Sequence, residues 1–201
     1  MDPFLLFFNT LIKVDDATIK LVEDHCRVVT IPRKKIVLHE GDLANRVYFV
    51  VSGKARSFYT DFSGKTTTWL FHFNVPESHI KNLFLVDYKG FVSNQPSQIS
   101  IETLTEVRAI LFTREQTDFL IEHSAIFERG MRRISDASFT RVYDRIYTLL
   151  TMSADQRYKK LLKEEPHLLQ LFSNNDIASY LGVAPQSLSR IKAIHAHGKH
   201  H

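Results

Sequence analysis

Hydrophobic positions follow a strand-like period through the middle of the chain. Between Cys26 and about Thr113 they form short runs, rich in β-branched and aromatic residues and often alternating with polar ones, which predict strands. The runs are CRVVTI, KKIVLHE, RVYFVVSG, KARSFYTD, TTTWLFHF, ISIETLT and VRAILFT. Turn residues separate several of them, including Ser52-Gly53 and Asp61–Gly64. Many short strands at this spacing indicate a β-sandwich or jelly roll rather than a parallel α/β sheet.

A helical period flanks the strands. Residues 11–25 are predicted to be helical, and Arg114–His123 is predicted to form a short helix capped by Thr113. A long helix is predicted from about Ser124 to Met152. Its apolar stripe is Phe127, Met131, Ile134, Ser138, Val142, Ile146 and Leu149. Its other faces are predicted to carry Arg129, Arg132, Arg133, Asp136, Arg141, Asp144 and Arg145. A narrow stripe on a charged helix favours a two-helix dimer seam, and packing against the protein's own barrel is the competing interpretation.

Two stretches fit neither pattern. Residues 74–98 interrupt the strands and are predicted to be irregular or partly helical, over one mouth of the barrel. The start, MDPFLLFF, is too short to span a bilayer and is expected to pack onto the core rather than to act as a secretory signal. The single cysteine, Cys26, is predicted to be a buried, inert thiol and fits a reducing compartment. We therefore expect a cytoplasmic protein without a membrane partner.

The most specific motif is SNNDIASYLGVAPQSLSRIK, residues Ser173–Lys192. Apolar residues occur where two short, steeply crossing helices must bury side chains: Ile177, Leu181, Val183, Leu188 and Ile191. Gly182 lies at the turn, where a left-handed backbone is needed. Asn174 or Asn175 is expected to cap the first helix, and Pro185 to lie in the first turn of the second. The pattern predicts a DNA-binding helix-turn-helix, with a plain helical hairpin as the alternative.

Charge is concentrated in the same part of the chain. The formal net charge is +4 over 201 residues. Residues 157–201 carry seven Lys or Arg and three acidic residues, whereas residues 1–156 are balanced. The excess thus accompanies the helix-turn-helix, as attraction to phosphate requires. The last seven residues, HAHGKHH, are expected to be a disordered tail.

The order of these parts resembles the Crp/Fnr superfamily of bacterial transcription regulators. The fragment HEGDLANRVYFVVSGKARSFY (His39–Tyr59) is similar to the glycine-bearing hairpins of a cyclic-nucleotide-binding fold. Residues Arg157–Lys192 are similar to a version common in Bacteroidetes, with a P-x-S-L-S-R recognition helix. The resemblance implies an α+β protein with an eight-stranded β-roll or jelly-roll domain (residues 1–123), a long dimerisation helix (124–152) and a helix-turn-helix domain (153–201). It also implies a homodimer on a two-fold symmetric operator in double-stranded DNA, with RNA polymerase as a further candidate partner.

The resemblance also assigns DNA contacts. Gln186 falls where the family often has a base-reading glutamate, Arg190 matches its base-reading arginine, and Pro185 replaces a frequent second arginine. The Arg190 fork suits guanine O6 and N7, and Gln186 suits adenine. The predicted base-reading residues are Gln186, Ser187 and Arg190. The predicted phosphate contacts, which position the protein without specifying sequence, are Ser173, Asn174, Ser189 and Lys192.

The span that holds cyclic nucleotides in such relatives is altered here. There a short helix with a Gly-Glu pair and a following arginine bind the ribose and the cyclic phosphate. The corresponding span, PESHIKNLFLVDYKGFVSNQPSQISIE, has no Gly-Glu pair, and Ser97-Gln98 stands near the place of the arginine. We therefore expect no cofactor and no cyclic AMP or GMP binding of the usual kind. Candidate lining residues for an unknown small-molecule effector are Trp69, Phe71, Phe84 and Tyr88, with simple filling of the barrel as the alternative.

An enzyme is the weakest interpretation. Jelly rolls include metal-dependent cupins, which need clustered histidines and a glutamate facing the barrel interior. Here His39, His72 and His79 are scattered, and the sequence has no nucleophile motif, P-loop or HExxH. No catalytic or metal-binding residue is predicted. The predicted function is a homodimeric transcription regulator with a degenerate or repurposed effector pocket. The alternative is a ligand-sensing or protein-interaction module that has lost specific DNA binding.

Overall fold

The computed structural model describes residues 2–76 and 82–197, which divide into two compact units. The β-roll unit comprises Met1–Tyr59 and Phe71–Phe139, and the helical unit comprises Thr60–Leu70 and Thr140–His201. Two strands and the longest helix each contribute residues to both units. No helix within the described ranges has the length and apolar character needed to cross a membrane.

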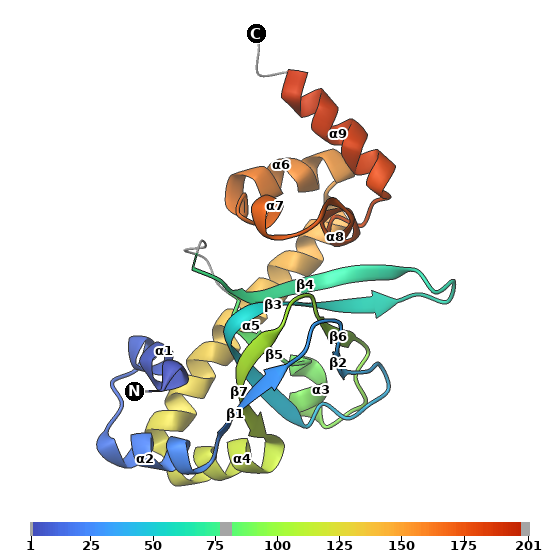
Figure 1. The fold of residues 1–201 in the computed structure, drawn as a ribbon. Helices are drawn as coiled ribbons and strands as arrows, with labels where there is room; N and C mark the ends of the chain where they lie inside the picture. Colours follow the sequence, from blue (N-terminus) through green and yellow to red (C-terminus); the bar gives the residue numbers. More distant parts are fainter. Residues whose placement is uncertain (1, 77–81, 198–201) are drawn as a thin grey trace. The chain divides into compact units, whose positions relative to one another are not determined.

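An antiparallel sheet forms the framework (Figure 1). The described residues contain seven of the eight strands that the resemblance implies: β1 (Arg27–Ile31), β2 (Ile36–Leu38), β3 (Arg46–Thr60), β4 (Thr66–Asn74), β5 (Phe84–Leu85), β6 (Ser100–Thr103) and β7 (Val107–Thr113). Their order is β1-β7-β3-β6-β2, and β4 and β5 also pair with β3. The predicted α+β class, with a jelly-roll-like sheet followed by helices, is confirmed.

Strand β3 corrects one prediction. The sequence predicts two strands separated by a turn at Ser52-Gly53, whereas β3 runs without reversal through both of them. Gly53 has φ +106°, and a Cβ at this position would lie 2.3 Å from the Glu106 carbonyl oxygen. The pairing register with β7 shifts between Val50 and Ser52, after which β3 pairs with β6. The glycine therefore marks an irregularity where β3 changes partners rather than a hairpin turn.

Five helices supply residues to the β-roll unit: α1 (Pro3–Leu11), α2 (Asp16–Asp24), α3 (Tyr88–Ser93), α4 (Arg114–His123) and α5 (Ala125–Thr151). The helix predicted over residues 11–25 is wrong in its first part, because α1 ends at Leu11 and α2 begins only after Asp15. The Asp15 carboxylate accepts a hydrogen bond from the Thr18 amide at 2.8 Å. The predicted cap of α4 is confirmed as a capping box between Thr113 and Gln116.

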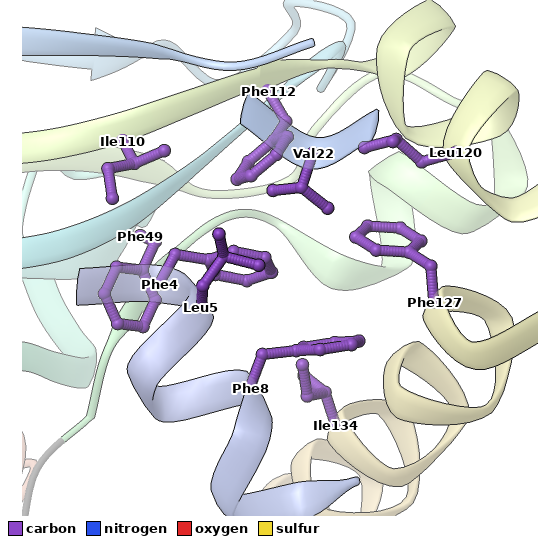
Figure 2. Packing of buried hydrophobic residues seen from close by; sticks show 10 residues of the cluster. All are labelled: Phe4, Leu5, Phe8, Val22, Phe49, Ile110, Phe112, Leu120, Phe127 and Ile134. Carbon is purple, nitrogen blue, oxygen red and sulfur yellow. The ribbon is translucent and has the colours of Figure 1, made fainter. Parts of the chain in front are cut away.

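The N-terminal helix lies in the core of the β-roll unit, as predicted for this apolar segment. Figure 2 shows the cluster, which consists of Phe4, Leu5, Phe8, Val22, Phe49, Ile110, Phe112, Leu120, Phe127 and Ile134. The rings of Phe8 and Phe127 stack with centroids 5.4 Å apart. A Cβ on Gly130 would lie 2.0 Å from Phe8 Cζ, so α5 approaches α1 this closely only because residue 130 has no side chain. Cys26, predicted to be buried, is only half-buried where it packs against the cluster, and desolvation raises the pKa of its thiol to about 11, which disfavours the reactive thiolate.

The apolar stripe predicted on α5 is only partly a surface feature. Phe127 and Ile134 are buried in the core of the β-roll unit and Met131 packs against it, so this part of the proposed dimer seam is wrong. The competing interpretation, packing against the protein's own barrel, holds there. Within the helical unit the predicted Ile146 is exposed, whereas the predicted Val142 and Leu149 are half-buried. Ile146 lies in an exposed apolar line with three residues outside the predicted stripe, Tyr143, Tyr147 and Leu150. Arg145, predicted to lie on a charged outer face, is buried instead.

The helical unit contains α6 (Ala154–Glu164), α7 (Leu168–Leu171), α8 (Asn174–Tyr180) and α9 (Pro185–His197) together with the end of α5. Its buried apolar residues include Tyr158, Leu161, Leu168, Phe172, Ile177, Ala178, Leu181 and Leu188. Helix α9 includes the start of the segment predicted as a disordered tail, and His195 Nε2 lies 2.6 Å from Asp155 Oδ1. The tail prediction is therefore wrong for residues 195–197, and residues 198–201 lie outside the described residues.

Candidate functional site

Helices α8 and α9 meet at a glycine turn in the helical unit (Figure 1). Gly182 has φ +67°, and its amide donates to the Ser179 carbonyl at 3.0 Å. The Val183 amide donates to the Ala178 carbonyl at 3.0 Å, which completes a Schellman motif. Pro185 is the first residue of α9, as predicted. The predicted helix-turn-helix is thus formed by local hydrogen bonds that the sequence specifies.

The N-cap residue of α8 is neither of the two predicted residues, Asn174 and Asn175. The N-cap is Ser173, whose hydroxyl oxygen accepts a hydrogen bond from the Asp176 amide at 3.1 Å. The same hydroxyl donates to Asp176 Oδ2 at 2.6 Å. Ser173 is also a predicted phosphate contact, and its hydroxyl proton already has a carboxylate partner.

The first turns of α9 present the predicted base-reading residues at the surface. Gln186 and Arg190 are exposed, and Ser187 is half-buried. Arg190 Nη2 lies 3.4 Å from Ser187 Oγ, a long and weak hydrogen bond that a ligand can replace. On the opposite side of the helix Leu188 is 1% exposed and packs in the core of the unit. This geometry leaves the guanidinium fork accessible for a base edge.

The remaining predicted phosphate contacts lie near the same surface. Lys192 Nζ donates to Asn174 Oδ1, which links α9 to the start of α8. The Ser189 hydroxyl donates to the Pro185 carbonyl at 3.1 Å within α9. Lys192 is half-buried, whereas Asn174 and Ser189 are exposed.

Local pairs reduce the positive charge that the sequence count suggests. Lys159 Nζ lies 2.9 Å from Asp155 Oδ2, and Lys160 Nζ lies 3.0 Å from Glu164 Oε2. The Lys159 and His195 hydrogen bonds lower the pKa of the Asp155 carboxyl. Arg157 donates to the Met152 carbonyl at 2.8 Å. Two of the described basic residues, Lys159 and Lys160, are therefore paired with carboxylates, so general attraction to phosphate depends more on the others.

Comparison with known proteins places this geometry in a fold family. Residues 28–124 match the cyclic nucleotide-binding domain family. FixK2 from Bradyrhizobium japonicum is similar with a TM-score of 0.70 and 19% identity over 86% of this chain and 86% of that chain. A protein from Eubacterium rectale, described as a transcriptional regulator of the crp/fnr family, gives a TM-score of 0.66 and 17% identity over 89% of this chain and 82% of that chain. The chain has the Crp/Fnr fold.

A further Crp/Fnr-type structure covers nearly the whole chain. The c-di-GMP responsive global regulator CLP from Xanthomonas campestris is similar with a TM-score of 0.67 and 17% identity, over 92% of this chain and 93% of that chain. The search of curated proteins finds no match. The solved structures therefore show the fold of the chain. Its function must be inferred from its own residues, because one fold serves many functions.

The β-roll unit contains a pocket of about 360 Å³. Its lining is Val37, Leu38, Asp42, Leu43, Ala44, Asn45, Arg46, Tyr48, Leu85, Val86 and Ile101. None of the four predicted effector residues lines it. Phe71 is buried, and Phe84 packs against Phe49 with ring centroids 5.5 Å apart. Trp69 belongs to the helical unit, and Tyr88 is half-buried on α3.

A buried carboxylate lies in the span that the Crp/Fnr resemblance assigns to cyclic nucleotides. Asp87, directly before α3, is 8% exposed and accepts a hydrogen bond from the Ser97 hydroxyl at 2.8 Å. Gly90 makes room for it, because a Cβ there would lie 2.8 Å from Asp87 Oδ2. Sequence reasoning noted Ser97 near the place of the missing arginine and overlooked Asp87. The sequence signal was the replacement of the Gly-Glu pair by an acidic residue at the start of the short helix.

The described histidines form no metal cluster. No group of three or more His, Cys, Asp and Glu that could hold a metal occurs in residues 2–76 and 82–197. His72 is 3% exposed, and its Nε2 lies 3.1 Å from Ser57 Oγ, as in a hydrogen-bonded core residue. His79 lies outside the described residues.

Proposed function

We propose that this protein is a DNA-binding transcription regulator that acts as a homodimer. The observation that carries the proposal is the exposed Arg190 on a recognition helix whose other side is fixed by Leu188 and by the Gly182 turn. The Crp/Fnr fold, shared with the global regulator CLP and the Eubacterium rectale transcriptional regulator, supports the same function. No enzymatic role is proposed, and the expected location is the cytoplasm.

The recognition helix α9 would enter the major groove of double-stranded DNA. Arg190 would bind guanine O6 and N7 through two parallel hydrogen bonds, and Gln186 would bind adenine. Lys192 and Asn174, already joined to each other, would face the phosphate backbone beside the groove. RNA polymerase is proposed as a further partner at the promoter.

The second copy in the proposed dimer would pack on the exposed apolar line of α5. Tyr147 and Leu150 are 56% and 80% exposed, and Tyr143 and Ile146 precede them by one turn. Residues at 143, 146, 147 and 150 repeat at steps of three and four, the spacing of a two-helix seam. A two-fold dimer also explains how one chain with a single recognition helix would read both halves of a symmetric operator.

The effector pocket is proposed to be degenerate or repurposed, without binding of cyclic AMP or GMP. The Crp/Fnr resemblance places a phosphate-binding arginine near Ser97-Gln98, and its absence removes a charge-assisted hydrogen bond worth roughly 1.5–3 kcal/mol. An unidentified effector could contact the 360 Å³ pocket instead, where Arg46 and Asp42 supply charge.

Cyclic nucleotides are therefore expected to leave the melting temperature unchanged. A ligand at about 100 times its Kd stabilises the folded state by about 2.7 kcal/mol, which raises Tm by several degrees in a protein of this size. Thermal denaturation with millimolar cyclic AMP or cyclic GMP measures this directly. A reproducible rise of several degrees with either nucleotide, absent with the corresponding linear monophosphate, would contradict the proposal.

Selection from a randomised duplex library tests the proposed function. The full-length protein is incubated with the library, bound DNA is recovered and sequenced, and a selected duplex is titrated by fluorescence anisotropy. We expect enrichment of a short site with two-fold symmetry, because two recognition helices read it. Retention of all sequences alike, with an affinity that falls steeply with salt, would contradict specific regulation and favour a module that has lost sequence-specific binding.

A further inference from the structure

Helix α8 is held by a buried arginine within the helical unit. Arg145 on α5 is 5% exposed. Its Nε donates to the Trp69 carbonyl at 3.1 Å, and its Nη2 donates to the Thr68 carbonyl at 3.2 Å. The same Nη2 donates to the Tyr180 carbonyl at the end of α8. The guanidinium also lies 3.7 Å from the centre of the Tyr180 ring.

A serine side chain reinforces this connection between α8 and strand β4. The Thr68 amide donates to Ser179 Oγ at 2.9 Å, and the Ser179 hydroxyl lies 3.2 Å from the Thr66 carbonyl that it donates to. At the end of the same helix the Tyr180 hydroxyl donates to Glu165 Oε2 at 3.0 Å. Burial raises the pKa of Tyr180, so this hydroxyl keeps its proton. The Ser179 side chain thus binds α8 directly to β4, and the Tyr180 carbonyl binds α8 to Arg145 on α5.

Arginine is required by this geometry. A buried charge is tolerated only when hydrogen bonds and nearby charge or π density replace its water. The guanidinium meets that need by spanning two carbonyls of β4 and one of α8 while stacking on a ring. A lysine has one nitrogen and no planar face, so it cannot replace this set of contacts although it keeps the charge.

We propose that Arg145 is a positioning residue for DNA recognition: together with Ser179 it fixes α8 on β4, and α8 fixes the recognition helix. The last step follows from the buried contacts of Ile177 and Leu188 and from the Gly182 turn, which join α8 and α9 into one body. The chain passes between the two units in β3, in β4 and in α5. The cluster therefore lies on two of the three chain segments through which a change in the roll would reach the recognition helix. The effect on DNA binding rests on the proposed function, whereas the cluster itself can be tested without DNA.

Hydrogen exchange of the full chain without DNA provides the first test. The variants are Arg145→Lys, Arg145→Gln and Ser179→Ala, and the matched control is Arg132→Lys, an exposed arginine on the same helix. Peptides that cover residues 66–70 and 174–180 are expected to exchange at least about tenfold faster in the three variants and at the wild-type rate in the control. The emission of Trp69, the single tryptophan of the chain, is expected to shift in the Arg145 variants.

DNA titration provides the second test. Arg145→Lys keeps the net charge, so its affinity for a scrambled duplex is expected to stay at the wild-type value. Its affinity for the selected duplex is expected to fall at least about tenfold, because a less fixed recognition helix loses its base contacts. A loss caused by unfolding would reduce both affinities and would appear in the melting temperature.

The outcomes separate this proposal from the proposed function. Unchanged exchange in all three variants would overturn the fixing role of Arg145. Faster exchange with unchanged affinity for the selected duplex would overturn its role in DNA recognition and leave a purely structural arginine. Failure of the wild type to select any DNA sequence would overturn the proposed function, while the exchange result would still decide whether Arg145 holds α8.

Discussion

Aspartate at both Ile146 and Leu150 is expected to give a monomer of 23.3 kDa that no longer binds the selected operator. The two side chains are 42% and 80% exposed, which is compatible with a folded monomer after substitution. In a two-helix seam four carboxylates would approach one another without cationic partners, at a cost of several kcal/mol. A monomer reads one half-site, and loss of the second site lowers affinity by roughly 10²–10⁴-fold. Size-exclusion chromatography with light scattering and anisotropy titration measure the two effects.

The control is Ala137→Asp, which adds one of the two negative charges of the double variant, at an exposed position on the same helix. It is expected to remain dimeric and to bind the selected duplex with the wild-type affinity. An Ile146→Asp, Leu150→Asp double variant that keeps the mass of a dimer would show that the two-fold contact lies elsewhere on the protein.

Replacement of Arg190 by alanine is expected to remove sequence preference at one position of each half-site. A bidentate arginine–guanine contact discriminates by about 1–3 kcal/mol, which corresponds to roughly 5–150-fold. In a dimer the loss applies to both half-sites. Selection from the randomised library should therefore lose the guanine at that position, and the selected duplex should bind only slightly better than a duplex changed there.

Lys192→Ala provides the contrasting result. Because this lysine is a predicted phosphate contact, its loss is expected to weaken all duplexes alike and to reduce the salt dependence by about one unit of slope. Lys163→Ala, an exposed lysine on α6, serves as the control for a general loss of charge. Equal weakening of selected and scrambled duplexes by Arg190→Ala would assign Arg190 to the phosphate backbone instead of the base edges.

Short-range signals explain why the helix-turn-helix could be predicted from the sequence. Gly182, Pro185 and the apolar spacing all act within a few residues of one another, and each suits the same turn. The cap was misassigned because Ser173, Asn174 and Asn175 are adjacent and all three residue types cap helices well. The choice among them depends on where the preceding chain enters, which local sequence does not specify.

Long-range contacts explain the errors. Gly53 has a backbone conformation that suits a turn as well as a strand irregularity, and its close neighbour Glu106 is distant in sequence. Arg145 looks like one more charged residue of a solvent-exposed face, because its carbonyl partners on β4 and α8 are far away along the chain. The buried pair of Asp87 and Ser97 was overlooked for the same reason. Helix α5 carries one set of apolar residues that packs in the core of the β-roll unit and another set that is exposed in the helical unit. Only tertiary contacts determine which set is buried.

In the β-roll unit Asp87 accepts a hydrogen bond from the Ser97 hydroxyl, within the span that the Crp/Fnr resemblance assigns to a small molecule. If no metabolite binds in the roll, the remaining input would be the abundance of the protein itself. Below the dissociation constant of a dimer, the dimer concentration rises with the square of the monomer concentration. Promoter occupancy would then depend steeply on the cellular concentration of the protein, which is set by the balance between its synthesis and its degradation.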